Sequence, residues 1–225
     1  MGKNPPSPRP DPDVTPVDDR SAAVRALRRH HSGTLQLHER VAQVKVVIEA
    51  ATGRIVMPVE PTFAAAGAEM LLWMPAESDW DVQASVLARL IERPEGSEAV
   101  DRWGAYHGAT SLSAWVACDI DGVKTETGVF GVEAQQANPL GRGEYPLIKR
   151  ANADRERLIA ACKAHAATAV PDALCVGVDP FGIDVKARFG IVRLEFAPGI
   201  AAGSPEVCGR EIDRLLGVAG AGGAA

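Results

Sequence analysis

The sequence has few aromatic residues and no excess of basic charge. Phenylalanine, tryptophan and tyrosine together make up 5% of its 225 residues, and the formal net charge is −5 at pH 7. A chain with this charge balance has no general electrostatic attraction for nucleic acid or for anionic membranes. We therefore expect neither nucleic acid nor a membrane surface as a partner.

Cysteine is also scarce, and no C-x-x-C pair of the kind found in zinc or thiol redox sites occurs. We expect the cysteines to be small buried hydrophobes in a reducing compartment, and we predict no metal site. No run reaches the roughly 18 apolar residues of a membrane span. The N-terminus has no apolar core of a signal peptide, so we expect a cytoplasmic protein. The four cysteines are Cys118, Cys162, Cys175 and Cys208.

The chain does have an ordinary globular composition, 46% hydrophobic and 24% charged, and enough length to bury a core. Residues 1–18 and 218–225 contain too little apolar material to fold, and we expect them to be flexible tails. A segment rich in Asn, Pro and Gly, 135–143, is typical of a linker. It divides the folded part into two predicted domains, 19–136 and 137–217.

The pattern of the first predicted domain is mainly that of β-strands. Short β-branched or apolar runs are separated by turn residues, and Asp-Gly is among the strongest short hairpin signals. Five or six antiparallel strands with one interposed helix predict a small barrel. The predicted elements are a helix capped by Ser21, strands at 41–50 and 54–60 around Ala51-Thr52-Gly53, a strand at 69–74, a helix from about Asp81 to Pro94, a strand at 99–106, and a hairpin of 113–120 and 123–133 around Asp121-Gly122.

The sequence has one local basic patch near the first predicted helix, and we interpret it as the solvated side of a helix. The patch consists of Arg25, Arg28, Arg29, His30 and His31.

The second predicted domain is an α-β-β-β-α unit. Apolar spacing predicts a long amphipathic helix over 147–162, and three strands follow. Ser204 is placed to cap a closing helix that turns its apolar residues inward. The predicted strands are 174–178, 183–187 and 191–196.

This second unit carries a set of motif residues. They are Asn138-Pro139-Leu140 before the helix, Asn152 and Asp154 within it, and Val178-Asp179-Pro180-x-Gly182-Ile183-Asp184 after it. The set resembles the C-terminal domain of the haem-utilisation proteins, which follows a split barrel similar to that of the pyridoxamine-phosphate oxidases. The resemblance implies an α+β fold, an FMN-binding-like split β-barrel followed by the small α-β-β-β-α domain. It also implies a homodimer and haem as the ligand.

In that family the helix motif carries two histidines, and Arg150 and Arg155 stand at those positions here. A guanidinium cannot coordinate iron, although it pairs well with carboxylates such as the haem propionates. Asn152 and Asp154 would then order the adjoining loop. The alternative is that Arg150 and Asp154 form a solvated i,i+4 pair, contributing about 0.2–0.5 kcal/mol.

Two further residues, Tyr106 and His107, are candidate contacts for a planar cofactor because they lie beside Trp103 and Gly104. The alternative is a packed strand end without a ligand. The predicted cofactor-binding residues are thus Arg150, Asn152, Asp154, Arg155, Tyr106 and His107.

The leading hypothesis is a haem or other tetrapyrrole-binding protein, with haem degradation and iron release as its oxidoreductase activity if it is an enzyme. An FMN-dependent oxidoreductase is the second: the stretch 77–89 offers Ser78, Ser85 and Arg89, but its acidic residues would repel a phosphate. A non-catalytic interaction or regulatory module is the third. No residue is assigned a catalytic role. The acidic residues of the stretch 77–89 include Asp79 and Asp81.

Overall fold

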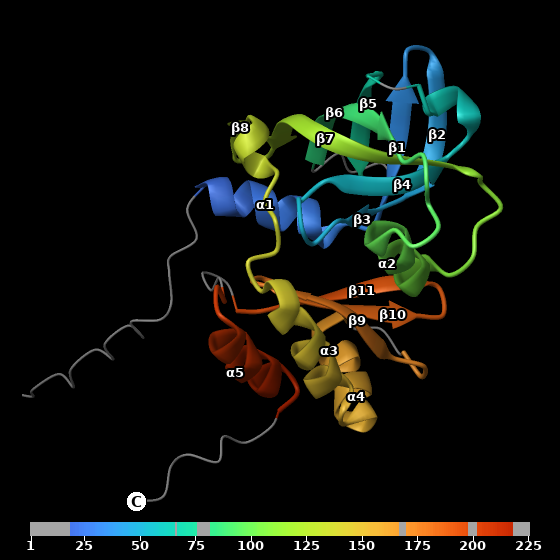
Figure 1. Cartoon of the computed structure of the whole chain (residues 1–225). Helices are drawn as coiled ribbons and strands as arrows, with labels where there is room; N and C mark the ends of the chain where they lie inside the picture. The colour runs from blue at the N-terminus through green and yellow to red at the C-terminus, as the bar shows by residue number, and fades with distance from the viewer. Residues whose placement is uncertain (1–18, 66, 76–81, 167–169, 198–201, 218–225) are drawn as a thin grey trace, which may run out of the picture.

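The computed structural model is a mixed α+β arrangement of two antiparallel sheets and five α-helices among the residues it describes. Helices α1 (Asp19–Arg29) and α2 (Glu98–His107) lie between the two sheets, and three further helices lie beyond the smaller sheet (Figure 1). The predicted tails fall outside the described residues. The described residues are 19–65, 67–75, 82–166, 170–197 and 202–217.

The large sheet is curled, and its inward face encloses one hydrophobic cluster. Its strands pair in the order β2-β1-β5-β6-β7-β4-β3, with β8 on β7, and every pairing is antiparallel. The strands are β1 (Ser32–Leu37), β2 (Arg40–Lys45), β3 (Val47–Ile48), β4 (Ile55–Val59), β5 (Glu69–Met74), β6 (Val82–Leu90), β7 (Ala114–Thr125) and β8 (Gly128–Phe130).

The small sheet has three strands in the order β11-β10-β9, and the helices beyond it enclose a second hydrophobic cluster. Short 3-10 turns, η1 (Pro61–Phe63), η2 (Val132–Ala134) and η3 (Gly141–Gly143), lie in the connections. The elements of this half are α3 (Glu144–Asn152), α4 (Arg155–Ala166), β9 (Leu174–Asp179), β10 (Gly182–Ala187), β11 (Gly190–Glu195) and α5 (Pro205–Leu215).

The structure confirms the α+β class and several local predictions. Strand β5 has the predicted bounds, and β3 and β4 form the hairpin around Ala51-Thr52-Gly53. The three strands of the small sheet are present, and the Ser204 hydroxyl accepts a hydrogen bond from the Val207 amide at the start of α5. All four cysteines are buried, as expected, and burial raises the pKa of Cys118 and Cys208 to about 12.

The predicted helix from Asp81 to Pro94 is wrong, because Val82–Leu90 is strand β6; Asp81 itself lies outside the described residues. Alternate residues of β6 are buried, and the strand pairs with β5 on one side and β7 on the other. Residues 82, 86 and 90 share a face in a helix nearly as well as in a strand, so periodicity did not separate the two. Residues 82–90 form a strand because they pair with β5 on one side and with β7 on the other.

The predicted strand at 99–106 is also wrong, since these residues belong to helix α2. Ala99, Trp103 and Tyr106 are buried at i, i+4 and i+7, which is one face of a helix. Strand β1 was not predicted, and the predicted hairpin turn at Asp121-Gly122 is wrong because β7 continues through these residues. The predicted helix over 147–162 is divided into α3 and α4 at Ala153-Asp154. Ser21 lies inside α1 and does not cap it.

Candidate functional site

A network of ionic and hydrogen-bonding side chains lies between the two sheets. Its residues come from α1 and the connection that follows it, from α2, from the first residue of α3 and from all three strands of the small sheet. Three guanidinium groups face three carboxylates there. The members of this buried network are Arg28, His31, Arg102, Tyr106, Glu144, Asp179, Asp184 and Arg193.

Asp184 on β10 is the centre of the network. One carboxylate oxygen lies 3.0 Å from both His31 Nε2 and Arg193 Nη1, and the other accepts a hydrogen bond of 2.8 Å from the Tyr106 hydroxyl. Burial by itself raises the pKa of Asp184, but His31 and Arg193 outweigh burial and hold the pKa well below its usual range. The carboxylate is therefore ionised and connects three separate segments of the chain.

Two neighbouring groups extend the network across the junction of the sheets. Arg102 on α2 donates two hydrogen bonds to Glu144, of 2.8 and 3.1 Å, and Glu144 also accepts from the Val178 amide. Arg193 donates to Asp179 at 2.6 Å. Buried charges are tolerated only when paired in this way, so the network fixes the position of α2 on the small sheet.

A small cavity of about 10 Å³ lies inside the network, about the volume occupied by one water molecule. Its walls include Asp179 and Asp184 of the small sheet and His31. A cavity of this size takes no cofactor, so the network is a structural junction and not a ligand pocket.

The basic patch around α1 belongs to this junction, and its interpretation as a solvated helix face is wrong. Arg28 is 5% exposed and lies 3.8 Å from Asp179, and its Nη2 donates to the Gln136 carbonyl. Arg25 and Arg29 both pair with Glu195, at 3.2 and 2.8 Å. Helix α1 therefore holds the two halves of the molecule together through its basic side.

The pairing of Glu195 predicts a pH dependence of stability. Burial by itself raises the pKa of Glu195, but Arg29, Arg25 and Arg193 lower it below its ordinary value. A carboxylate with a depressed folded-state pKa stabilises the fold above its unfolded pKa of about 4.3, and loses that contribution as the pH falls through the folded value. We expect Glu195→Gln to lower the free energy of unfolding by about 1 kcal/mol at pH 7 and progressively less below about pH 4.

Urea unfolding at pH 7, 5 and 3 measures this difference. Glu126→Gln, in the exposed turn between β7 and β8, is the matched control and should have no effect at any of these pH values. A penalty for Glu195→Gln that stays constant down to pH 3 would show that the charge of Glu195 is not its cause.

Tyr106 and His107 lie at the C-terminal end of α2 and not at a strand end. The Tyr106 phenol is buried, and burial together with Asp184 raises its pKa well above the ordinary value, so it stays protonated. His107 Nε2 lies 3.0 Å from the Val46 carbonyl oxygen, and its ring packs on Trp103 at 4.9 Å between centroids. Burial lowers the pKa of His107 to about 4, so this imidazole is neutral at pH 7.

The other four predicted residues lie on or beside α3 and α4, where each has a partner. Arg150 pairs with Asp213 of α5 at 2.8 Å, and Asp154 with Arg157, so the predicted Arg150–Asp154 pair is wrong. The side-chain amide of Asn152 bonds both the N–H and the C=O of Cys175 on β9, at 2.8 and 2.9 Å.

Arg155 completes the set with an exposed ion pair to Asp172. The structure does not bring the six predicted residues together. Tyr106 and His107 are on the side of the small sheet that faces α2, and the other four are on the side covered by α3 and α4 (Figure 1).

The stretch considered for a flavin phosphate lies partly on β6. Ser85 is half-buried on the outward side of that strand, and Arg89 pairs with Asp119 of β7. Ser78, Asp79 and Asp81 lie outside the described residues. The described part thus offers one arginine for a phosphate, and this arginine already has a carboxylate partner.

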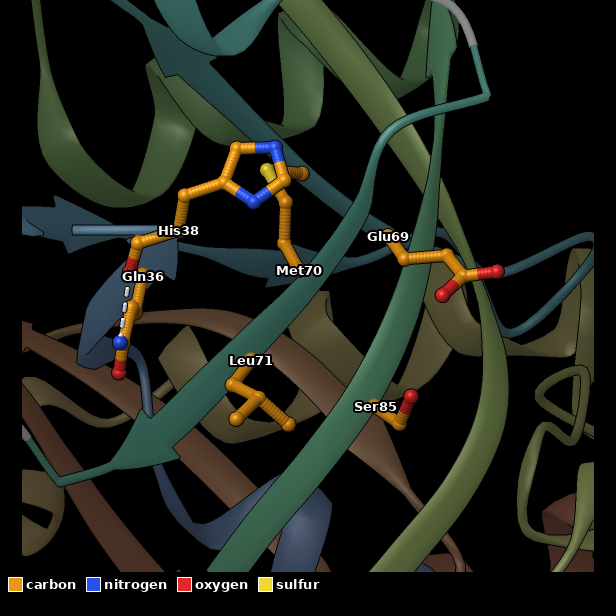
Figure 2. A pocket seen from close by; sticks show the side chains of 6 residues that line it. All are labelled: Gln36, His38, Glu69, Met70, Leu71 and Ser85. Atoms are coloured by element: carbon orange, nitrogen blue, oxygen red, sulfur yellow. Dashed lines mark hydrogen bonds between the residues drawn. The ribbon is translucent and has the colours of Figure 1, made fainter. Parts of the chain in front are cut away.

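Larger hollows lie on the outward side of the large sheet, around β1, β5 and β6. Helix α2 packs on β3 and β4, and α1 on β7, β8 and η2, which leaves this side lined by half-buried side chains. Gln36, Leu71 and Ser85 lie in one row across the three strands. The first hollow has a volume of about 290 Å³ and is lined by Gln36, His38, Glu69, Met70, Leu71 and Ser85 (Figure 2).

A second hollow, of about 600 Å³, lies at the end of the β1–β2 hairpin. Both hollows are of the size that small-molecule sites have in proteins. His38 belongs to both. Sequence reasoning assigned no role to His38, because the hairpin connection Leu37-His38-Glu39-Arg40 contains no glycine, proline or asparagine to mark a turn. The second hollow is lined by Leu37, His38, Glu39, Arg40 and Thr62.

Comparison with known proteins defines the fold more than the function. No family model and no curated protein matches the chain. The structure is similar to that of a protein of unknown function from Agrobacterium tumefaciens str. C58, with a TM-score of 0.65 and 16% identity over 92% of this chain and 99% of that one. This likeness shows a shared fold across both sheets.

A haem-binding protein from Mycobacterium smegmatis also matches, with 21% identity over 88% of this chain and 96% of that one. Its TM-score is 0.39, which is too low to support an inference. Among the described residues, no helix combines the length and the apolar character needed to cross a bilayer.

Proposed function

We propose that the protein binds a tetrapyrrole, with haem as the first candidate, on the outward side of the large sheet. In this proposal the curled sheet is a split barrel of the FMN-binding type, residues 19–136 and 137–217 are its two domains, and two copies pair as in the haem-utilisation proteins. The sequence motif of the second domain supports the resemblance. The motif residues themselves serve the fold: Asn138 bonds Val178, Asn152 bonds Cys175, and Asp184 holds the junction.

The observation that carries the proposal is the pair of hollows on the large sheet. Each is large enough for a small ligand, and they share His38 in their linings, whereas the buried network offers room for one water only. Leu71 supplies half-buried apolar surface to the first hollow, whereas Leu37 and Met70 in the lining are almost fully buried. Arg40 is the arginine of the second hollow, which also contains Glu39, whereas Arg150 and Arg155 on the other half already pair with Asp213 and Asp172.

Such a protein is a binding protein rather than a catalyst of haem degradation. Oxygen activation on haem needs a distal pocket closed to water and controlled by hydrogen bonds. The hollows are open depressions on the surface of a strand layer. We therefore propose a non-catalytic role in holding or delivering the ligand.

The test is a haemin titration of the full chain followed by visible absorption. A saturable Soret band that sharpens at one equivalent per chain is the expected result, and metal-free protoporphyrin IX should compete for the same site. A spectrum indistinguishable from haemin mixed with an unrelated acidic protein would overturn the proposal. Bound FMN in the purified protein, with bands near about 370 and about 450 nm, would replace it with the flavin alternative.

A further inference from the structure

The cavity inside the buried network is lined almost entirely by polar side chains. Its volume of about 10 Å³ is close to the least that holds one water molecule. Charges of both signs line it, since Arg28 and Arg102 lie on its walls together with Asp179 and Asp184. Of the described residues that line it, only Ile48 has a wholly apolar side chain. The other lining residues are His31 and Tyr106.

Arg28 and Asp179 both line the cavity and approach each other without a direct hydrogen bond. Arg28 Nη1 lies 3.8 Å from Asp179 Oδ2, which is beyond hydrogen-bonding distance. Arg28 Nη2 is engaged elsewhere, because it donates to the Gln136 carbonyl oxygen. Asp179 Oδ1 likewise accepts from Arg193 and from the Phe181 amide. At a separation of 3.8 Å, a water molecule can bridge Nη1 and Oδ2.

Two more lining residues have a buried nitrogen that no protein group bonds within the described part of the chain. These atoms are Arg102 Nε and His31 Nδ1. The Nη atoms of Arg102 donate to Glu144 and Tyr106. His31 Nε2 lies 3.0 Å from Asp184 Oδ1. A buried donor without an acceptor is costly, so a further polar group is expected beside these residues.

The charges on the walls favour water over an ion. An anion would lie against Asp179 and Asp184, and a cation would lie against Arg28 and Arg102. A water molecule donates to carboxylates and accepts from guanidinium groups, so walls of both signs suit it. Toward His31 Nδ1 it acts as acceptor or donor, whichever the protonation of the ring requires.

We propose that the cavity binds one long-lived water molecule, which accepts hydrogen bonds from Arg28 Nη1 and Arg102 Nε and donates one to Asp179 Oδ2. About three bonds are usual for a buried water. Its three partners belong to α1, α2 and β9. The water is therefore a component of the junction between the two sheets, at a place separate from the hollows of the large sheet.

The experiment is nuclear magnetic resonance of the full, isotopically labelled chain, with cross-relaxation measured between water and the Nε–H of Arg102. We expect a cross-peak whose NOE and ROE have the ratio of a water bound for longer than the tumbling time of the protein. The Tyr106 hydroxyl lies 3.1 Å from Arg102 Nη2, and its exchanging proton can relay magnetisation from bulk water. Tyr106→Phe removes this hydroxyl and should leave the cross-peak in place.

Oxygen-17 relaxation dispersion gives an independent readout, because it counts the long-lived water molecules of a protein. Ile48→Phe adds a ring at the wall of the cavity, and it should lower the count by one and abolish the Arg102 cross-peak. Val129→Phe is the matched control, since it places the same ring at a site that is 78% exposed. This control should change neither the count nor the cross-peak. Circular dichroism checks that both variants fold.

The outcomes decide the proposal in each case. A wild type without the cross-peak would overturn it, and so would loss of the cross-peak in Tyr106→Phe, which would trace the signal to hydroxyl exchange. A saturable shift of the Arg102 Nε–H resonance on titration with chloride would replace the water by an anion. A folded Ile48→Phe with the wild-type count would show that the cavity holds no long-lived water. If Ile48→Phe does not fold, the wild type and Tyr106→Phe decide alone.

Discussion

Replacing Asp184 by alanine is expected to lower the free energy of unfolding by about 3–5 kcal/mol. The carboxylate is buried and accepts from Tyr106, His31 and Arg193. Its removal leaves the Arg193 guanidinium, which is 6% exposed, with Asp179 as its remaining carboxylate partner in a region closed to water. The network then holds three guanidinium groups against two carboxylates, and such an excess of buried charge costs far more than the loss of a surface pair. Urea denaturation followed by circular dichroism gives the difference.

A matched control for this variant is Asp172→Ala. Asp172 also pairs with an arginine, Arg155, but its side chain is 75% exposed, so its removal should cost no more than about 0.5 kcal/mol. Asp184→Asn keeps the shape of the side chain and removes the charge, and it provides a measurement if the alanine variant does not fold. Equal effects of Asp184→Ala and Asp172→Ala would show that the buried network does not hold the two halves together.

Gly177→Ala is the second substitution with a large expected effect. A Cβ at this position of β9 would overlap the Tyr106 hydroxyl oxygen and lie 2.9 Å from its Cζ. Tyr106 would have to move, and its hydrogen bonds with Asp184 and Arg102 would be lost or strained. We expect a loss of about 1–3 kcal/mol in the free energy of unfolding, the usual range for overpacking in an interior.

A double-mutant cycle with Tyr106→Phe identifies the cause. Phenylalanine lacks the hydroxyl that the new methyl group would overlap, so Gly177→Ala should cost clearly less in the Tyr106→Phe background than in the wild type. Gly203→Ala is the control, because a Cβ there has no neighbour within 4 Å. Additive effects of Gly177→Ala and Tyr106→Phe would mean that the contact between β9 and α2 is not what the methyl group disturbs.

Several elements could be predicted because their signals are local. The predicted strands 174–178 and 183–187 contain β-branched residues and are separated by Asp179-Pro180-Phe181-Gly182, which contains residues typical of turns. Ser204 before Pro205 is a helix start that needs no distant partner. The burial of the cysteines could be predicted because a free cysteine behaves as a small hydrophobic residue.

Other elements were misjudged because distant pairing overrides local pattern. Strand β6 has apolar spacing compatible with a helix, and only its pairing with β5 and β7 makes it a strand. Arg28 and His31 resemble solvated surface residues until Asp179 and Asp184, more than 150 residues away along the chain, are placed against them. His38 lies in a connection without turn residues, and its place in the linings of two hollows depends on the packing of strands that are distant in the sequence.

The sequence by itself thus determined the α+β class, the three strands of the small sheet and the closing helix, and the burial of the cysteines, because these depend on residues close together in the chain. The tertiary structure decided which ionisable groups meet, which face of the large sheet stays uncovered, and which histidine faces a hollow. These properties depend on how α1, α2 and the two sheets are packed. Charge pairing and exposure are set by that packing, and the identity of a side chain does not reveal its distant neighbours.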